Sequence, residues 1–240
     1  MATTGCDSSK SVEISRGGRV SLVIFDCDGV LVDSEVIACR EDAACLSDAG
    51  FPVTPEEMAR RFVGTSAKSM LVTLSEQYQR QPQPGLNELR QARIMAAFEM
   101  ELQPILGILE AVSQLRAKRC IASSSPLHRI VRSLELTGLR DYFGGSLYSA
   151  SMVARGKPAP DLFLYAAAQM KVDPLECVVI EDSHSGVVGA KAAGMRVVGF
   201  VGGSHCGPGH AERLRAAGAD VVIQSMADLP KVLPECYTAA

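Results

Sequence analysis

Six short runs rich in Val and Ile constrain the fold of this chain more than any other feature. They lie at 20–26, 119–123, 146–149, 177–182, 196–200 and 220–223. Continuous apolar runs of this length are typical of strands covered on both faces, as in a parallel sheet. Patterns typical of helices lie between the later runs, at 108–118, 126–137, 161–170 and 183–193. This alternation predicts a doubly wound α/β domain.

The interval between the first two runs is far longer than one crossover connection requires. Helical patterns fill it, at about 34–49, 55–62, 66–80 and 86–100. In the last pattern, one face is predicted to carry Leu86, Leu89, Arg93, Ala96 and Met100. We therefore expect residues 35–103 to form an inserted helical bundle, and 19–34 together with 104–240 to form the sheet domain. Residues 1–18, rich in Ser, Thr and Gly, are predicted to be a flexible tail.

The composition excludes several classes of function. A net charge of −3 over 240 residues argues against a nucleic-acid or anionic-membrane surface. No apolar run approaches the roughly 20 residues that a membrane span needs. The eight cysteines are scattered and form no CxxC pair, so they are interpreted as buried, reduced thiols of a cytoplasmic protein. A small metabolite is the expected partner, and the chain is expected to be a monomer or a small homo-oligomer.

Side chains able to do chemistry gather where the predicted strands end, which is the edge at which open parallel sheets bind ligands. They are Asp26 and Asp28 after the first run, Ser123 and Ser124 after the second, Lys157 after the third, and Glu181 and Asp182 after the fourth. Clustered acids need compensation, and one lysine cannot neutralise four carboxylates. Oxygen ligands without histidine favour Mg²⁺.

A cation and a lysine beside paired carboxylates point to chemistry on a phosphate, whose negative charge they would offset. Asp26 can attack phosphorus and form an aspartyl-phosphate. Asp28 lies two positions further on and points to the same side of the chain. It can protonate the leaving oxygen and later accept a proton from water. Ser123 and the amides that open the helix at Pro126 are suited to hold phosphoryl oxygens.

Four segments, FDCDGVLVDS, IASSS, GKPAPD and VVIEDSHSG, resemble in order the four motifs of the haloacid dehalogenase superfamily. The resemblance extends from about Ser21 to Leu229. It is to the branch whose Rossmann-like core carries a helical cap between the first and second motifs.

The resemblance also implies roles for single residues. Asp26 would be the nucleophile and Asp28 the general acid/base, with Ser123 on the phosphoryl group and Lys157 bridging the nucleophile and the phosphate. Ser124, next to Ser123, is a further candidate for phosphate binding. Mg²⁺ would be held by Asp26, by the backbone carbonyl of Asp28 and by Asp182, with Glu181 orienting a coordinated water. In the cap, Val63-Gly64-Thr65 lies where relatives place a substrate loop, so Gly64 and Thr65 are candidate specificity residues.

Differences within the superfamily narrow the expected activity. Dehalogenase members lack an acid at the position of Asp28, which favours phosphoryl transfer. Phosphoglucomutases typically carry a lysine, an arginine and a histidine at the positions of Val63, Ala67 and Ala38. We therefore expect a Mg²⁺-dependent phosphatase of small phosphorylated metabolites, most simply sugar or sugar-acid phosphates. A β-phosphoglucomutase-like mutase and a catalytically silent phosphometabolite-binding protein stay open as alternatives.

The segment SHCGPGH at 204–210 places His205, Cys206 and His210 near one another in the sequence. Their number and spacing are poor for a closed tetrahedral zinc site. We expect this segment to be a loop after a strand.

Overall fold

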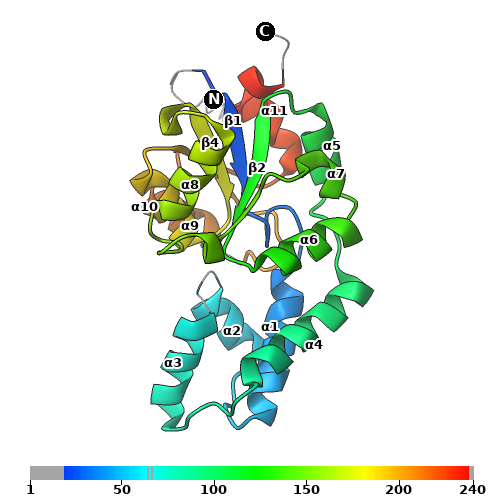
Figure 1. Ribbon diagram of the computed structural model, residues 1–240, viewed down its shortest axis with the longest axis vertical. Coiled ribbons are helices and arrows are strands. Elements are labelled where there is room, and N and C mark those ends of the chain that lie inside the picture. The colour runs from blue at the N-terminus through cyan, green and yellow to red at the C-terminus, as the bar shows by residue number, and fades with distance from the viewer. Residues whose placement is uncertain (1–18, 64, 66, 238–240) are drawn as a thin grey trace, which may run out of the picture.

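The structure is a computed structural model that describes residues 19–63, 65 and 67–237. Among these residues, six parallel strands form one sheet with the order β3-β2-β1-β4-β5-β6 (Figure 1). The strands are β1 (Leu22–Phe25), β2 (Lys118–Ser123), β3 (Leu147–Ser149), β4 (Cys177–Glu181), β5 (Arg196–Phe200) and β6 (Val221–Ile223). Each predicted run coincides with one strand to within a few residues, so the predicted fold class is confirmed. The tail predicted at 1–18 lies outside the described residues.

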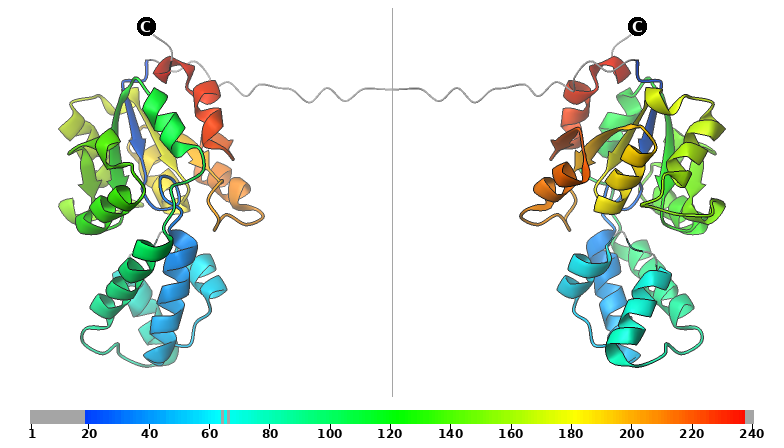
Figure 2. Two further views of the ribbon diagram at one scale, coloured as in Figure 1. Left: turned by 90° about the vertical axis from the view of Figure 1, so that its right-hand side faces the viewer. Right: turned by 90° about the vertical axis from the view of Figure 1, so that its left-hand side faces the viewer.

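Helices cover both faces of the sheet. Successive strand residues point to opposite sides, and in β1 the apolar residues on both sides are buried. Val23 and Phe25 of β1 face α5 (Ile108–Gln114), α6 (Leu127–Leu136), α7 (Arg140–Phe143) and α11 (Leu229–Val232). Leu22 and Ile24 face α8 (Asp161–Met170), α9 (His184–Ala192) and α10 (His210–Ala217). Figures 1 and 2 show these two helical layers on either side of the strands.

Four helices form a separate bundle beyond the carboxyl ends of the strands (Figures 1 and 2). They are α1 (Glu35–Asp48), α2 (Pro55–Phe62), α3 (Ala67–Tyr78) and α4 (Leu86–Glu101). We call this bundle the cap. It has its own core, in which Leu46 and Leu74 are fully buried. A capping box between Thr54 and Glu57 starts α2.

The chain passes between the sheet domain and the cap twice, along two adjacent segments. The Asp33 N–H donates to the Gln103 carbonyl at 3.0 Å, and the Ile105 N–H donates to the Leu31 carbonyl at 3.0 Å. These bonds hold the entry and the exit of the cap together. The domain boundaries after residue 34 and before residue 104 stay a prediction.

The face of α4 that the sequence pattern marks is not the face that the helix buries. Its buried residues are Leu86, Arg90, Ile94 and Phe98, whereas Leu89 is 50% exposed and Met100 is 82% exposed. Residues four positions apart form the stripe that packs inward, and Arg90 holds an interior place because it pairs with a buried acid of α1. The spacing of apolar residues alone cannot predict an arginine on the buried face of a helix.

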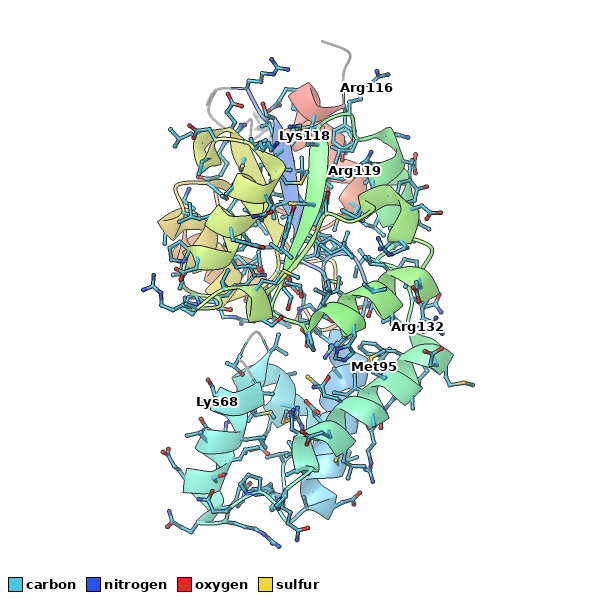
Figure 3. The ribbon with its side chains drawn as sticks, viewed as in Figure 1. Lys68, Met95, Arg116, Lys118, Arg119 and Arg132 are labelled. Atoms are coloured by element: carbon cyan, nitrogen blue, oxygen red, sulfur yellow. The ribbon has the colours of Figure 1, made fainter. Side chains whose placement is uncertain are left out.

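The outer side of α4 also ties the cap to the sheet domain. Arg132 on α6 donates to both carboxylate oxygens of Glu99 on α4, each at 2.6 Å. Figure 3 shows Arg132 on α6 and Met95 on the facing part of α4. Met95 packs against a buried apolar cluster to which both the sheet domain and the cap contribute residues.

Two further expectations concern membranes and thiols. Within the described part of the chain, no helix combines the length and apolarity that crossing a membrane requires. The described cysteines, Cys27, Cys39, Cys45, Cys120, Cys177, Cys206 and Cys236, all carry free thiols.

Candidate active site

The side chains predicted to do chemistry meet at one cavity between the sheet and the cap. The cavity encloses about 210 Å³, and its wall includes Asp26, Asp28, Ser123, Ser124, Lys157 and Asp182. Glu181 lies behind this wall and is fully buried. Thr65 lines the cavity from the cap side, and Gly64 lies outside the described residues.

Asp26 follows β1 directly and continues its pairing, since its N–H donates to the Ile180 carbonyl at 3.0 Å. The chain then turns back sharply, and the Gly29 N–H donates to the Val32 carbonyl at 2.8 Å. Gly29 has a φ of +76°, and a Cβ atom there would lie 1.9 Å from Asp182 Oδ2. Only glycine lets this loop approach the acids so closely.

Lys157 joins two of the acids. Its Nζ donates to Asp26 Oδ1 at 2.8 Å and to Glu181 Oε1 at 2.6 Å. Burial lowers the pKa of Lys157, but the two carboxylates outweigh burial and raise it, so the ammonium stays charged. The side chain is 2% exposed, which fixes its position. Lys157 is therefore a buried point charge held against Asp26.

Lys157 compensates the negative charge of the buried Asp26 carboxylate only in part. Burial raises its pKa well above the ordinary value, Lys157 offsets only part of that rise, and the nearby Glu181 and Asp182 carboxylates add to it. An attacking carboxylate must be ionised. The surroundings of Asp26 therefore call for one more cation.

Asp28 has the opposite surroundings. Arg129 Nη2 donates to its Oδ1 at 2.9 Å, Ser34 Oγ donates to Oδ1 at 2.7 Å, and Ser125 Oγ donates to Oδ2 at 2.6 Å. Burial raises the pKa of Asp28, but Arg129 and the two hydroxyls outweigh it, and the net shift is downward. Asp28 thus has its own counter-ion, separate from the Lys157 pair.

Glu181 is the last residue of β4, and Asp182 follows it directly. Glu181 Oε2 accepts from the Ser183 N–H at 2.8 Å and from Ser183 Oγ at 2.9 Å. A Cβ atom at Gly186 would lie 1.7 Å from Glu181 Oε1, so the first turn of α9 must be glycine there. These contacts hold the Glu181 carboxylate in position to accept from Lys157 Nζ.

The donor set fits Mg²⁺. One carboxylate oxygen from each of Asp26, Glu181 and Asp182 lies within 4.8 Å of the others. Oxygen ligands are those that hard divalent cations prefer. Two observations support a cation at this position. Lys157 offsets only part of the rise in the pKa of Asp26, and the Gly29 backbone lies close to Asp182.

The loop after β5 and the start of α10 bring His205, Cys206 and His210 together, with ligand atoms within 4.8 Å of one another. His205 Nε2 lies 3.0 Å from Asp182 Oδ2, and His210 Nε2 donates to the Asp182 carbonyl at 2.6 Å. Burial lowers the pKa of His205, but hydrogen bonds to Asp182 and Cys206 outweigh it and raise the pKa to about 11. Both histidines thus hold Asp182 in place.

A family model described as haloacid dehalogenase-like hydrolase matches residues 20–194. The chain belongs to this family. The match covers all four motifs that line the cavity, from Asp26 to Asp182.

Several relatives of this haloacid dehalogenase-like hydrolase have names that specify an activity. It is 31% identical to the 6-phosphogluconate phosphatase of Escherichia coli over 191 residues, which is 79% of this chain and 86% of the relative. It is 35% identical to hexitol phosphatase B of Escherichia coli over 193 residues, 77% of this chain and 85% of the relative. Among solved structures, a conserved haloacid dehalogenase-like protein from Agrobacterium tumefaciens is 44% identical, with a TM-score of 0.79. That likeness covers 90% of this chain and 98% of the other.

The phosphate-binding prediction for this hydrolase involves two neighbouring serines. Ser123 is 1% exposed, and its Oγ accepts from the Ser125 N–H at 3.1 Å. Ser124 is exposed, and both serines line the cavity. The first turn of α6 begins at Leu127, directly after Pro126, and the amides of a first helical turn have no partner within the helix.

Sequence reasoning missed the partners of Asp28 in this hydrolase and the acid next to it. Arg129 and Ser133 are buried on α6 together with Ile130 and Leu134. An arginine next to these apolar positions is the sequence feature that could have identified the partner of Asp28. Glu35, at the start of α1, lines the cavity. Burial, together with Asp28 and Asp182, raises the pKa of Glu35 to about 7.

Proposed function

We propose that this hydrolase is a Mg²⁺-dependent phosphatase of small phosphorylated carbohydrates, acting through an aspartyl-phosphate on Asp26. One observation carries the proposal: Asp26 and Asp28 share one cavity, yet each has a different cation, Lys157 for one and Arg129 for the other. Two neighbouring carboxylates with separate partners can perform two different tasks. The phosphatase names of two relatives support the same reaction class.

In the first step, a carboxylate oxygen of Asp26 forms a bond to phosphorus while the bond to the leaving oxygen breaks. Lys157 holds Asp26 in position and offsets the charge of the phosphoryl group. Bound Mg²⁺, held by Asp26, Asp182 and the Asp28 carbonyl, would add positive charge where attacking and attacked groups are both anionic. Ser123 and Ser124, with the amides at the start of α6, would hold phosphoryl oxygens.

Asp28 moves the protons. It protonates the leaving oxygen of the substrate, so that an alcohol departs. The resulting carboxylate then takes a proton from the water that attacks phosphorus, which releases inorganic phosphate and restores Asp26. Arg129, Ser34 and Ser125 lower the pKa of Asp28. Its protonated form is therefore a strong acid toward the leaving oxygen, and its carboxylate form is the stable one when water attacks.

The cap wall favours water over a second sugar hydroxyl as the final acceptor. Ala38, Val63 and Ala67 line the cavity where phosphoglucomutases of this superfamily carry cationic or imidazole side chains. Small apolar residues at these positions offer no charge to a second phosphate. A phosphatase is therefore a better fit than a mutase.

The free, mostly buried thiols support a reducing, cytoplasmic setting. The expectation of a monomer or a small homo-oligomer stays a prediction.

The experiment is a phosphate-release assay on a panel of glucitol 6-phosphate, gluconate 6-phosphate, glucose 6-phosphate and β-glucose 1-phosphate, with Mg²⁺ and with a chelator. The proposal expects release with Mg²⁺ from the wild type and loss of release in Asp26→Asn. Asp228→Asn, which alters an ion pair with the exposed Lys231 outside the four motifs, is the control and should keep full activity. Conversion of glucose 1-phosphate into glucose 6-phosphate without phosphate release would indicate a mutase. Binding without turnover would indicate a silent protein, and full turnover in Asp26→Asn would refute the mechanism.

A further inference from the structure

The cavity has a polar end inside the cap, away from the catalytic acids. Asp42 on α1 and Arg90 and Gln91 on α4 line it there, and we call these three residues the distal polar cluster. Glu35 lines the same cavity next to the catalytic acids. Asp42 comes seven residues after Glu35 on α1, so it lies about 10 Å further along the helix axis.

The distal polar cluster has hydrogen-bonding groups that lack partners. Asp42 Oδ2 accepts from Arg90 Nη2 at 2.6 Å, and the two side chains are only 13% and 3% exposed. The other oxygen, Asp42 Oδ1, is buried without a hydrogen-bond partner among the described residues, as are Arg90 Nε and Gln91 Oε1. Native proteins rarely leave such buried groups unpaired, because each costs free energy. All three atoms belong to residues that line one cavity, and a rotation of these side chains toward the cavity would let a ligand pair with them. This arrangement points to an occupant.

The chemistry of the unpaired atoms restricts that occupant. Asp42 and Arg90 neutralise each other, which leaves two acceptors and one donor at a site without net charge. A hydroxyl group both donates and accepts, so neighbouring hydroxyls match this set. A carboxylate or a second phosphate would instead face the Asp42 carboxylate oxygen and the Gln91 carbonyl oxygen.

The wall between the two ends of the cavity is apolar. Met58, Phe62, Met70 and Ile94 line it there. Such a wall can pack against the carbon atoms of a chain whose hydroxyls are paired at the far end. The cavity therefore has an anionic-phosphate end, an apolar middle and a neutral hydrogen-bonding end.

We propose that the distal polar cluster binds the hydroxyl groups of a neutral polyol, so that the preferred substrates are open-chain sugar-alcohol or sugar phosphates with one phosphate. This inference rests on the proposed phosphatase function and specifies its substrate class. It predicts that a second anionic group at the far end of the substrate, as in gluconate 6-phosphate, lowers kcat/KM relative to glucitol 6-phosphate.

Two variants and two matched controls test the inference. Gln91→Leu removes an acceptor and leaves the ion pair intact, and Glu88→Leu is its exposed control on α4. Asp42→Asn removes the negative charge, and Asp48→Asn is its control, since Asp48 pairs with Arg93 across the same two helices on the surface. Thermal unfolding of each variant identifies any that fails to fold. If Asp42→Asn unfolds because Arg90 loses its counter-ion, Gln91→Leu still decides the question.

The measured quantities are ratios of kcat/KM. In Gln91→Leu, the ratio for glucitol 6-phosphate over p-nitrophenyl phosphate should fall about fivefold to tenfold, as expected for one lost hydrogen bond. In Asp42→Asn, the ratio for glucitol 6-phosphate over gluconate 6-phosphate should fall by at least as much. Both controls should keep the wild-type ratios.

Three results would overturn the inference: unchanged ratios in both variants, an equal loss on all substrates, or a wild-type preference for gluconate 6-phosphate. These outcomes are distinct from failure of the proposed function. That failure would appear as a wild-type protein that releases phosphate from none of the substrates, p-nitrophenyl phosphate included, and it would remove the inference as well.

Discussion

Replacement of Arg129 by methionine tests how the site stabilises its second acid. Arg129 lies on α6, and its guanidinium donates to Asp28 Oδ1 at 2.9 Å and lies 4.9 Å from the centre of the Phe98 ring. Both members of the ion pair are 11% exposed at the side chain. Methionine keeps much of the volume of arginine and removes its charge, so Asp28 would stay buried with only two hydroxyl donors.

The expected loss of folding stability in Arg129→Met is large for a single substitution. Removing one partner of a buried ion pair costs about 3–5 kcal/mol, since the other charge is left uncompensated. The hydroxyls of Ser34 and Ser125 keep part of the stabilisation of Asp28. We therefore expect the free energy of unfolding to fall by about 3–4 kcal/mol at pH 7. The pKa of Asp28 is lower in the folded state than in the unfolded chain. The stability that the Arg129–Asp28 pair contributes is therefore fully present above the unfolded pKa of about 3.9. It is lost as the pH falls through the lower pKa of the folded state.

Urea denaturation followed by circular dichroism measures the loss. The control is Arg132→Met on the same helix, where an exposed arginine pairs with Glu99 and its removal should cost about 1 kcal/mol or less. Adding Asp28→Asn to Arg129→Met should restore stability, because it removes the uncompensated charge. Equal losses at Arg129 and Arg132, or a double variant less stable than Arg129→Met, would refute this account of Asp28.

Three further outcomes follow from the same contacts. Lys157→Met, which takes a buried charge from Asp26, should lower kcat for phosphate release by at least about 10²-fold, and a loss below tenfold would contradict its role. Removal of divalent cations with a chelator should abolish phosphate release, and added Mg²⁺ should restore it and raise the unfolding temperature, measured by calorimetry. Gly186→Ala, which places a methyl group against Glu181, should lower the unfolding temperature by at least about 2–4 °C. Gly207→Ala, with nothing within 4 Å of its new methyl group, should leave that temperature nearly unchanged.

The sheet could be predicted from the sequence because its strands are covered on both faces. Continuous apolar runs report such burial directly, and all six runs became strands. The cap helices were also predicted, with bounds close to those observed. The buried face of α4 was not, because Arg90 occupies an interior position through an ion pair with Asp42, 48 residues away.

The acids of the site could be located because parallel strands present their carboxyl ends along one edge. Only one of their counter-ions followed this rule. Lys157 was found because it comes after the third run, whereas Arg129 is 101 residues from Asp28 and belongs to no motif that we identified. Pairing between side chains so distant in sequence depends on how α6 packs against the first loop, which local patterns do not encode.

The most direct test of the account is the detection of a phosphoryl group on Asp26. In Asp28→Asn, p-nitrophenyl phosphate should still react, because its leaving group needs little protonation, whereas attack by water should be slow without a base. The account predicts a burst of one p-nitrophenol per enzyme and, after acid quenching, a phosphorylated peptide that contains Asp26. Linear release at the wild-type rate without that peptide, or a phosphoryl group on another residue, would contradict it.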